Sequence, residues 1–206
     1  MTPNRLRLER ALAAIDAANA DDPHTIDLGG QERPKELAHA ELMTAWIERL
    51  VESPSEAQRL AGRAHHLRRW VSPRDGYPEG RAGYLRWRRD QAARQADEVA
   101  EILAGCGYDG ATVDRVQAII RKQDLRTDPE VQAHEDALCL VFLQTQLLEL
   151  AADLGPEKAA EVLAKTVKKM TPRGRSEALE LELPPSGRSA LEQALASVGS
   201  SPPGGA

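Results

Sequence analysis

The segment from residue 129 to 153 constrains the fold more than any other stretch of the chain. Asp128 can cap a helix, and Pro129 fits the first turn of that helix. Past Ala137 the segment is apolar nearly all round, which is typical of a helix surrounded by other elements. Its longest apolar run, ALCLVFLQTQLLELAA, is broken by polar residues, and so the pattern favours a buried helix over a membrane span. Residues 129–153 are therefore predicted to form the central helix of the core.

Composition points to the same fold class. Only 3% of the 206 residues are aromatic, and Ala, Leu, Glu and Arg, which favour helix, are abundant. No stretch has a convincing strand pattern. We therefore expect an all-α protein, a compact bundle of about seven or eight helices, with a single domain over residues 1–198. The tail over 199–206, rich in Gly, Ser and Pro, is expected to be disordered.

The cysteines and the N-terminus indicate a compartment. Cys106 and Cys139 stand far apart, which favours unpaired thiols in a reducing environment. The first twenty residues are charged and amphipathic, unlike a secretory signal peptide. A cytoplasmic protein with no membrane segment is expected.

Two predicted helices, 34–52 and 54–70, are joined by a turn so short that they must pack antiparallel. Ser53 and Glu56 are predicted to form a capping box for the second of them. His39 lies fourteen residues before Ser53 and His66 thirteen after it, which corresponds to about 21 and 20 Å along the two arms. His39 should therefore return to the level of the doublet His65-His66.

Glu135 and Asp136 stand one turn ahead of the most apolar run, where an unpaired carboxylate is costly to bury. The predicted metal ligands are His39, His65, His66 and Asp136, a nitrogen and oxygen set that suits Mn, Fe, Zn, Co or Ni. Glu135 is the candidate general base, or an acceptor for a ligand histidine. The alternative is that the histidines simply pair with carboxylates in the core or at the surface. Neighbouring helical residues point about 100° apart, so both members of the doublet can bind only if that helix end is irregular.

A cationic stretch adjoins the histidine doublet. Residues 59–94 contain ten arginines and three acids, a balance of +7 in a chain of net charge −5. Such an island attracts anions, and its aromatic rings offer stacking surfaces. The residues predicted to bind a small anionic or phosphorylated ligand are Arg69, Arg74, Tyr77, Arg81, Tyr84, Arg88 and Lys122. The alternative is a solvated, arginine-rich helix face.

Two resemblances follow from these motifs. A first His, a His-containing doublet twenty-six residues on and a later acid on a core helix resemble the HD-domain superfamily of metal-dependent phosphohydrolases, whose pattern is His, His-Asp and a distal Asp. It maps onto His39, His65-His66 and Asp136, with His66 in place of the usual aspartate. The segments AHHLRRW, YPEGRAGYLRWR and EDALCLVFL resemble more closely an uncharacterised domain-of-unknown-function family of bacteria and fungi, whose relatives often have histidine where Gln95 stands.

Two functions remain open at this point. The first is a metal-dependent hydrolase, HD-like, that acts on a small phosphorylated metabolite or nucleotide and uses a divalent metal. The second is a binding module without catalysis, which would hold a nucleotide, an RNA or a protein through its arginine and aromatic surface. A redox metalloenzyme on the same scaffold is a third alternative, which the resemblance to HD-like sites implies.

Overall fold

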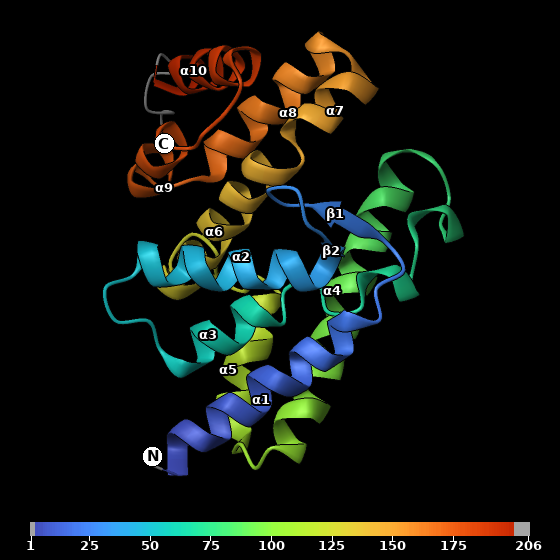
Figure 1. Cartoon of the computed structure of the whole chain (residues 1–206), viewed down its shortest axis with the longest axis vertical. Coiled ribbons are helices and arrows are strands. Elements are labelled where there is room, and N and C mark those ends of the chain that lie inside the picture. Colours follow the sequence, from blue (N-terminus) through green and yellow to red (C-terminus); the bar gives the residue numbers. More distant parts are fainter. Residues whose placement is uncertain (1–2, 200–206) are drawn as a thin grey trace. The chain divides into compact units, whose positions relative to one another are not determined.

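The computed structural model describes residues 3–199 of the 206-residue chain. In this range the backbone is helical almost throughout, with one pair of three-residue strands, and the predicted all-α class is confirmed. The described residues form ten α-helices against the predicted seven or eight (Figure 1). One reason is that the long helix predicted over 129–153 divides at Gln146. The contacts of the chain fall into two compact units, Met1–His134 and Glu135–Ala206.

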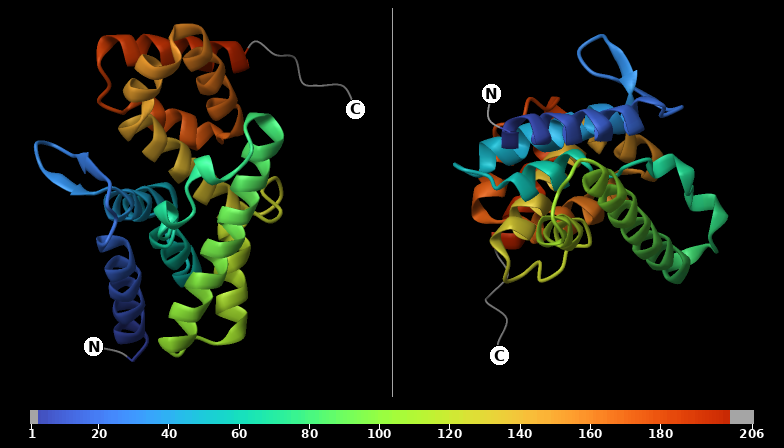
Figure 2. Two further views of the ribbon diagram at one scale, coloured as in Figure 1. Left: turned by 90° about the vertical axis from the view of Figure 1, so that its right-hand side faces the viewer. Right: turned by 90° about the horizontal axis from the view of Figure 1, so that it is seen from below.

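The first unit holds most of the helices. Its elements are α1 (Pro3–Ala20), β1 (Thr25–Asp27), β2 (Glu32–Pro34), α2 (Lys35–Leu50), α3 (Glu56–Arg63), the 3-10 turns η1 (Arg69–Val71) and η2 (Arg74–Gly76), α4 (Gly80–Gly105), α5 (Gly110–Ile120) and the start of α6 (Pro129–Thr145). The long α4 and the shorter α5 lie side by side (Figure 2).

The expectation that the chain has no strand was wrong for the polar connection after α1. Strands β1 and β2 pair antiparallel, with Ile26 opposite Arg33. The turn between them depends on Gly29 and Gly30, whose φ values of 65° and 84° suit the type I′ turn that tight hairpins favour. Leu28 N donates to the carbonyl oxygen of Gln31 at 3.0 Å and closes the turn. The hairpin stands out from the helices (Figure 2).

Helices α2 and α3 pack on each other as the short connection requires. A methyl group added at Gly62 would collide with Cδ1 of Ile47, so the two helices approach closely at this glycine. The capping box, however, is formed by Ser55 and Gln58, two residues later than predicted. Helix α3 also ends at Arg63, well before the predicted end at residue 70.

The core of the first unit lies between α1, α3, α4, α5 and the start of α6. Its fully buried side chains come from apolar positions at helical spacing on each of these helices. They include Ile15, Leu60, Leu67, Val99, Leu103, Val116, Ile119 and Val131. Because Leu67 belongs to this core, the chain beside the histidine doublet is anchored by buried apolar surface.

The second unit contains the remainder of α6 and four further helices. These are α7 (Leu147–Leu154), α8 (Pro156–Lys169), α9 (Pro172–Leu179) and α10 (Pro185–Gly199). Helix α8 packs against both α7 and α10, and its Leu163 and Val167 are fully buried. The apolar run that the sequence places in a core is divided between α6 and α7, and its residues Leu140, Leu143 and Leu147 are buried.

The single domain predicted over 1–198 stays a prediction. The disordered tail predicted over 199–206 lies, from residue 200 onward, outside the described residues. Between residues 3 and 199, no helix combines the length and the apolar character needed to cross a bilayer.

Candidate metal centre

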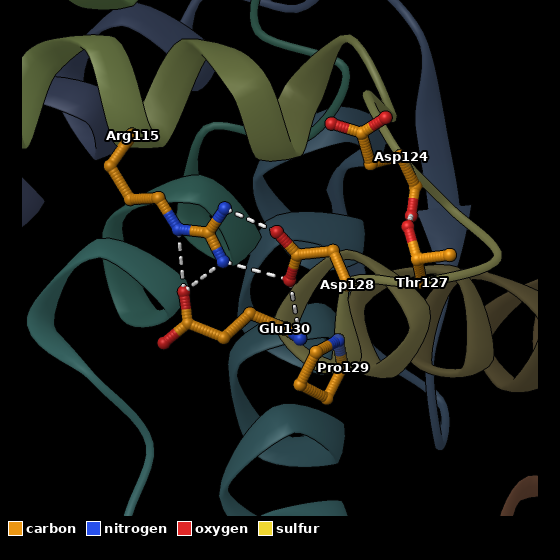
Figure 3. Close-up of a pocket in the computed structure, with 6 residues that line it drawn as sticks. All are labelled: Arg115, Asp124, Thr127, Asp128, Pro129 and Glu130. Atoms are coloured by element: carbon orange, nitrogen blue, oxygen red, sulfur yellow. Dashed lines mark hydrogen bonds and ion pairs between the residues drawn. The ribbon is translucent and has the colours of Figure 1, made fainter.

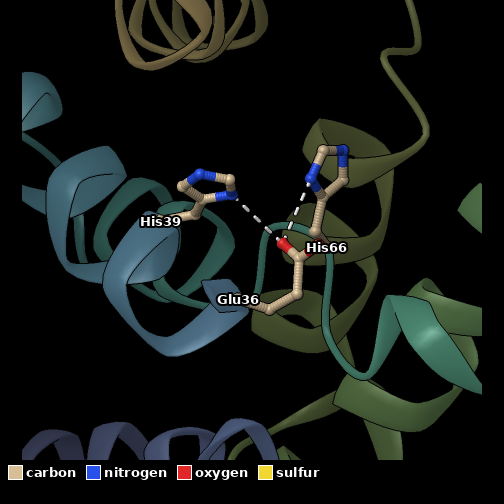
Figure 4. A group of neighbouring side chains, drawn as sticks. All are labelled: Glu36, His39 and His66. Atoms are coloured by element: carbon tan, nitrogen blue, oxygen red, sulfur yellow. Dashed lines mark ion pairs between the residues drawn. The ribbon is translucent and has the colours of Figure 1, made fainter. Parts of the chain in front are cut away.

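Two side chains in the first turns of α2 and one from the turn after α3 lie close together. Glu36 and His39 are three residues apart, which places them on one face of α2. Nδ1 of His39 lies 3.4 Å from Oε2 of Glu36, and Nδ1 of His66 lies 3.5 Å from the same oxygen (Figure 4). One possible ligand atom of each residue lies within 4.8 Å of the other two. We refer to Glu36, His39 and His66 as the Glu–His group.

His66 reaches this position because the chain leaves helical geometry after α3. His66 and Arg68 have φ values of 59° and 47°, in the left-handed region that costs non-glycine residues on the order of 1–3 kcal/mol each. Arg94 on α4 holds this turn, because its Nη2 donates to the carbonyl oxygens of Leu67 and Arg68 at 3.1 and 3.0 Å. The helix end is therefore irregular, as a joint role of His65 and His66 requires. The centroids of their rings lie 3.9 Å apart.

Behind the Glu–His group lies a second pair of imidazoles. Nδ1 of His65 is 3.0 Å from Nε2 of His134, and the two rings meet edge to face. Both residues are at least 95% buried. The outer nitrogens of the pair, Nε2 of His65 and Nδ1 of His134, have no hydrogen-bond partner among the described residues. Buried polar atoms in this state are rare, and each requires an explanation.

The pKa shifts in the group favour an ionised Glu36 beside a neutral His66. Burial by itself raises the pKa of Glu36, but His39 and His66 outweigh it and hold this pKa well below its usual range. Burial, followed by the charge of Arg69, lowers the pKa of His66 to about 4, although Glu36 opposes the shift. Burial also lowers the pKa of His65, and it lowers that of His134 to about 3 with the help of Lys122. Near neutral pH His65, His66 and His134 are therefore uncharged.

This donor set fits a divalent cation. An ion with ligand bonds of about 2.1 Å in tetrahedral geometry separates its ligand atoms by roughly 3.4 Å. The separations of His39 Nδ1 and His66 Nδ1 from Oε2 of Glu36 are 3.4 and 3.5 Å, and all three residues offer ligand atoms within 4.8 Å of one another. In addition, Oε2 of Glu36 is buried and accepts no hydrogen bond from a described residue, although it is the atom that both imidazoles face. Neutral imidazole and ionised carboxylate are the states in which these side chains bind metals.

The predicted residues Glu135 and Asp136 are buried as expected, and their known contacts lie in the second unit. Asp136 accepts hydrogen bonds from Thr171, one from its backbone nitrogen at 3.0 Å and one from its hydroxyl group. Glu135 lies 3.5 Å from Nζ of Lys169. Thr171 is itself the N-cap of α9, and so Asp136 supports the start of that helix. The roles of Asp136 as metal ligand and Glu135 as base stay predictions.

Of the predicted anion-binding residues, Arg69 lies beside the Glu–His group. Its Nη1 is 3.1 Å from both ring nitrogens of His66, and its guanidinium carbon lies 5.0 Å from the centre of the Trp87 ring. Lys122, with a positive φ of 56°, is close enough to depress the pKa values of His65 and His134. Arg69 and Lys122 therefore both bring positive charge near the histidines.

The other predicted anion-binding residues contact groups other than the histidines. Arg74 donates to the carbonyl oxygens of Tyr77 and Pro78 and so closes the loop before α4. Arg81, Tyr84 and Arg88 are exposed on α4, and the guanidinium carbon of Arg88 lies 5.8 Å from the centre of the Tyr84 ring. Their role in binding stays a prediction.

Glu36 and His134 were not among the site residues predicted from the sequence. Glu36 could have been found from its spacing, because Glu36-x-x-His39 places a carboxylate and an imidazole on one helical face. His134 was passed over because a side chain directly before the acid pair is expected to point away from it. Its spacing of three from the buried Val131 is the signal that places it on the inner face of α6.

A separate open hollow in the first unit is lined by Arg115, Asp124, Thr127, Asp128, Pro129 and Glu130 (Figure 3). Arg115 bridges Asp128 and Glu130 there through bidentate and shared contacts. None of these residues belongs to the Glu–His group, and Arg115 is already paired with Asp128 and Glu130. It offers a structural ion-pair cluster at the start of α6.

Comparison with known proteins places the chain by family alone. Neither the curated proteins nor the solved structures gave a match. The family model for a domain of unknown function, DUF4202, matches residues 9–191, nearly the whole chain and all of the histidines described above. The chain therefore belongs to the DUF4202 family.

Proposed function

We propose that this protein is a metal-dependent hydrolase of a small phosphorylated metabolite or nucleotide, with the metal held by Glu36, His39 and His66. The observation that carries the proposal is the convergence of two imidazoles, His39 and His66, on one buried carboxylate oxygen of Glu36, at 3.4 and 3.5 Å. A purely structural buried carboxylate is expected to accept well-formed hydrogen bonds, and Oε2 of Glu36 accepts none from the described residues.

The residues around the group support an anionic substrate. A divalent ion bound there would supply a Lewis acid that polarises a phosphoryl oxygen and lowers the pKa of a bound water. Arg69, which contacts the ring of His66, would bind the phosphate oxygens through its planar fork of donors. Lys122 would add a second positive charge near the same histidines. Stacking on Trp87 fixes the Arg69 guanidinium in place for this task.

The first test is metal content and metal affinity. We expect the purified protein to contain a divalent transition metal, or to bind Co²⁺ after treatment with a chelator. His39→Ala, His66→Ala and Glu36→Gln should each abolish or strongly weaken binding, whereas Glu32→Gln, on the exposed hairpin, should not. The variants' far-UV circular dichroism should match the wild type. Unchanged metal binding in all three variants would end the proposal.

Asp136→Asn tests the sequence-based prediction of a further ligand separately. A metal ligand at this position should lower affinity when it becomes an amide. A residue that only supports α9 through Thr171 should lower thermal stability and leave the affinity unchanged.

The second test is activity. Phosphate release should be measured on a panel of nucleoside phosphates and sugar phosphates with Mn²⁺, Co²⁺, Ni²⁺, Zn²⁺ or Fe²⁺. We expect hydrolysis of at least one class, loss with chelator, and loss in His66→Ala. Arg69→Ala should raise KM more than it lowers kcat, because Arg69 binds a phosphate group present in substrate and transition state alike.

A second candidate function is supported by the exposed part of α4. Tyr84 and Leu85 are 44% and 52% exposed, which is unusual for large apolar side chains, and Arg88 lies against the Tyr84 ring. Neither Arg81 nor Arg88 forms an ion pair with an acid among the described residues. An anionic partner with flat bases, such as single-stranded RNA, matches this surface.

Salt dependence separates this candidate from the hydrolase. A fluorescently labelled RNA oligomer should bind at low salt, lose affinity steeply as salt rises, and bind more weakly to Tyr84→Ala and Arg88→Ala. His66→Ala should bind RNA as the wild type does. The absence of RNA binding at low salt removes this candidate and leaves the hydrolase untouched.

A further inference from the structure

The first turn of α2, which presents Glu36 and His39, has no cap of its own. Its N-cap residue is Pro34, which has no side-chain donor or acceptor and makes no capping hydrogen bond. The missing cap comes from residues 22–24, which lie just before β1 in the chain. Oδ2 of Asp22 accepts a hydrogen bond from the backbone nitrogen of Glu36 at 2.9 Å, and the carbonyl oxygen of His24 accepts one from Lys35.

Asp22 is well placed for this task. Its side chain is 1% exposed, and its other oxygen, Oδ1, accepts from the backbone nitrogen of His24 at 3.0 Å. The Nδ1 atom of His24 lies at the same distance from Oδ1. The Asp22 carboxylate thus joins the backbone of His24, before the hairpin, to the backbone of Glu36 in the Glu–His group. A negative charge at a helix N-terminus is also favoured by the helix dipole.

The turn that presents His66 is held by the same short segment. Oδ1 of Asn19, in the last turn of α1, accepts from the backbone nitrogen of Arg68 at 2.9 Å. Asn19 is fully buried. Arg68 is the second left-handed residue of this turn, two positions after His66, so the bond stabilises a conformation that costs energy.

Asn19 and Asp22 are joined to each other. The backbone nitrogen of Asp22 donates to the carbonyl oxygen of Asn19 at 3.3 Å, which makes residues 19–22 a single turn at the end of α1. One end of this turn grips the arm that carries Glu36 and His39, and the other end grips the arm that carries His66. We propose that the Asn19–Asp22 turn is a positioning element that sets the distance between the two arms and so tunes metal affinity. This inference rests on the proposed metal site.

The size of the effect follows from what metal sites tolerate. Ligand atoms must be held within about 0.5 Å of their working positions by residues that do not touch the ion. Removal of such supporting residues lowers metal affinity by about 10–100-fold. We therefore expect Asp22→Ala and Asn19→Ala each to weaken Co²⁺ binding by about this factor. Asp22→Asn keeps an acceptor oxygen and should restore affinity toward that of the wild type.

The test compares these variants with a cap of equal chemistry elsewhere in the same unit. Asp109 caps α5 by accepting from the backbone nitrogen of Thr112 at 2.7 Å, and it belongs to neither arm. Asp109→Ala is therefore the matched control for the general cost of losing a helix cap. Co²⁺ dissociation constants, the visible spectrum of bound Co²⁺ and the melting temperature of the metal-free protein are measured for the full-length chain and each variant.

The positioning role predicts weaker binding and an altered Co²⁺ spectrum in Asp22→Ala and Asn19→Ala, with both unchanged in Asp109→Ala despite a similar fall in melting temperature. Wild-type affinity in Asp22→Ala and Asn19→Ala would overturn the positioning role and leave the metal site standing. An equal loss of affinity in Asp109→Ala would also overturn it, because stability alone would then explain the effect. Failure of the wild type to bind Co²⁺ would overturn the proposed function and this inference together.

Discussion

The protein buries carboxylates in two regions, and it treats them differently. Asp136, in the second unit, receives a backbone nitrogen and a hydroxyl group from Thr171. Glu36, in the first, faces two imidazoles and accepts no hydrogen bond at Oε2 from any described residue. A buried carboxylate that already accepts hydrogen bonds, as Asp136 does, stabilises the fold. A buried carboxylate that faces two imidazoles instead is a group that could hold a cation.

The comparison predicts that, in the metal-free protein, removal of the Asp136 charge lowers the free energy of unfolding more than removal of the Glu36 charge. Asp136→Ala should lower the free energy of unfolding by about 3 kcal/mol, because it removes charge-assisted hydrogen bonds and leaves donors of Thr171 without an acceptor. Glu36→Gln should cost less than this, because no well-formed hydrogen bond from a described residue to Oε2 is lost. Urea unfolding at pH 7 with chelator present measures both. Equal losses would show that the two carboxylates do the same work.

Bound metal should stabilise only proteins that keep the Glu–His group intact. A ligand present at about 100 times its dissociation constant stabilises the folded state by about 2.7 kcal/mol. Co²⁺ at that concentration should raise the free energy of unfolding of the wild type by this amount and leave His66→Ala unaffected. Asp136→Ala serves as a second control, because a residue that only supports α9 leaves the increment intact. A wild type that gains nothing from any divalent metal would remove the distinction drawn between the two regions.

The tightness of the second region can be tested by a single methyl group. A Cβ added at Gly174 would lie 2.7 Å from Cγ of Asp136, so Gly174→Ala should cost about 2 kcal/mol. Gly105, at the end of α4, has no atom within 4 Å of an added Cβ and no positive φ. Gly105→Ala should therefore be neutral or slightly stabilising. Similar melting temperatures for the two variants would mean that the Asp136 carboxylate can move aside.

A carboxylate at the surface gives the smallest expected effect and sets the scale for the buried ones. The hydrogen bond from Arg115 lowers the pKa of Asp128 from 3.8 to about 2, with further help from the backbone nitrogens of residues 131 and 130. The folded pKa lies below the unfolded one, so the stabilisation is complete above about pH 4 and is lost as the pH falls through 2.

Asp128→Asn should therefore reduce stability by on the order of 1 kcal/mol at pH 6, after allowance for solvent screening of a side chain that is 20% exposed. The difference from the wild type should shrink between pH 4 and pH 2. Unfolding measured as a function of pH checks this, and a constant difference over that range would exclude the ion pair as its cause.

The meeting of His39 with His66 was predictable, because a helix advances by a fixed amount per residue and the two arms of the hairpin are equally long. Both imidazoles do face the same oxygen. The contact between the rings of His65 and His66 was not predictable, because it depends on left-handed residues that are not glycine. Nothing local in AHHLRRW signals that α3 ends at Arg63. Asn19 and Arg94, which hold that end, are 49 and 26 residues from Arg68 in the chain.

The partners of Glu135 and Asp136 could not be predicted from the sequence for a similar reason. Burial of Asp136 followed from its place before an apolar run, and the structure agrees. Its use was a different matter, since Thr171 lies 35 residues later and its approach depends on how α6, α8 and α9 fold together. Patterns within a helix locate buried charges, whereas tertiary contacts decide whether such a charge is already satisfied.

The left-handed backbone of His66 also bears on how this site can diversify. Aspartate, asparagine and histidine are the side chains that most readily adopt this conformation apart from glycine. Position 66 can thus exchange a nitrogen donor for an oxygen donor while the chain path stays the same. Oxygen donors suit magnesium and manganese, and imidazole suits zinc, iron and nickel. If the proposed site binds a metal, we expect His66→Asp to move its preference from one class of ion toward the other.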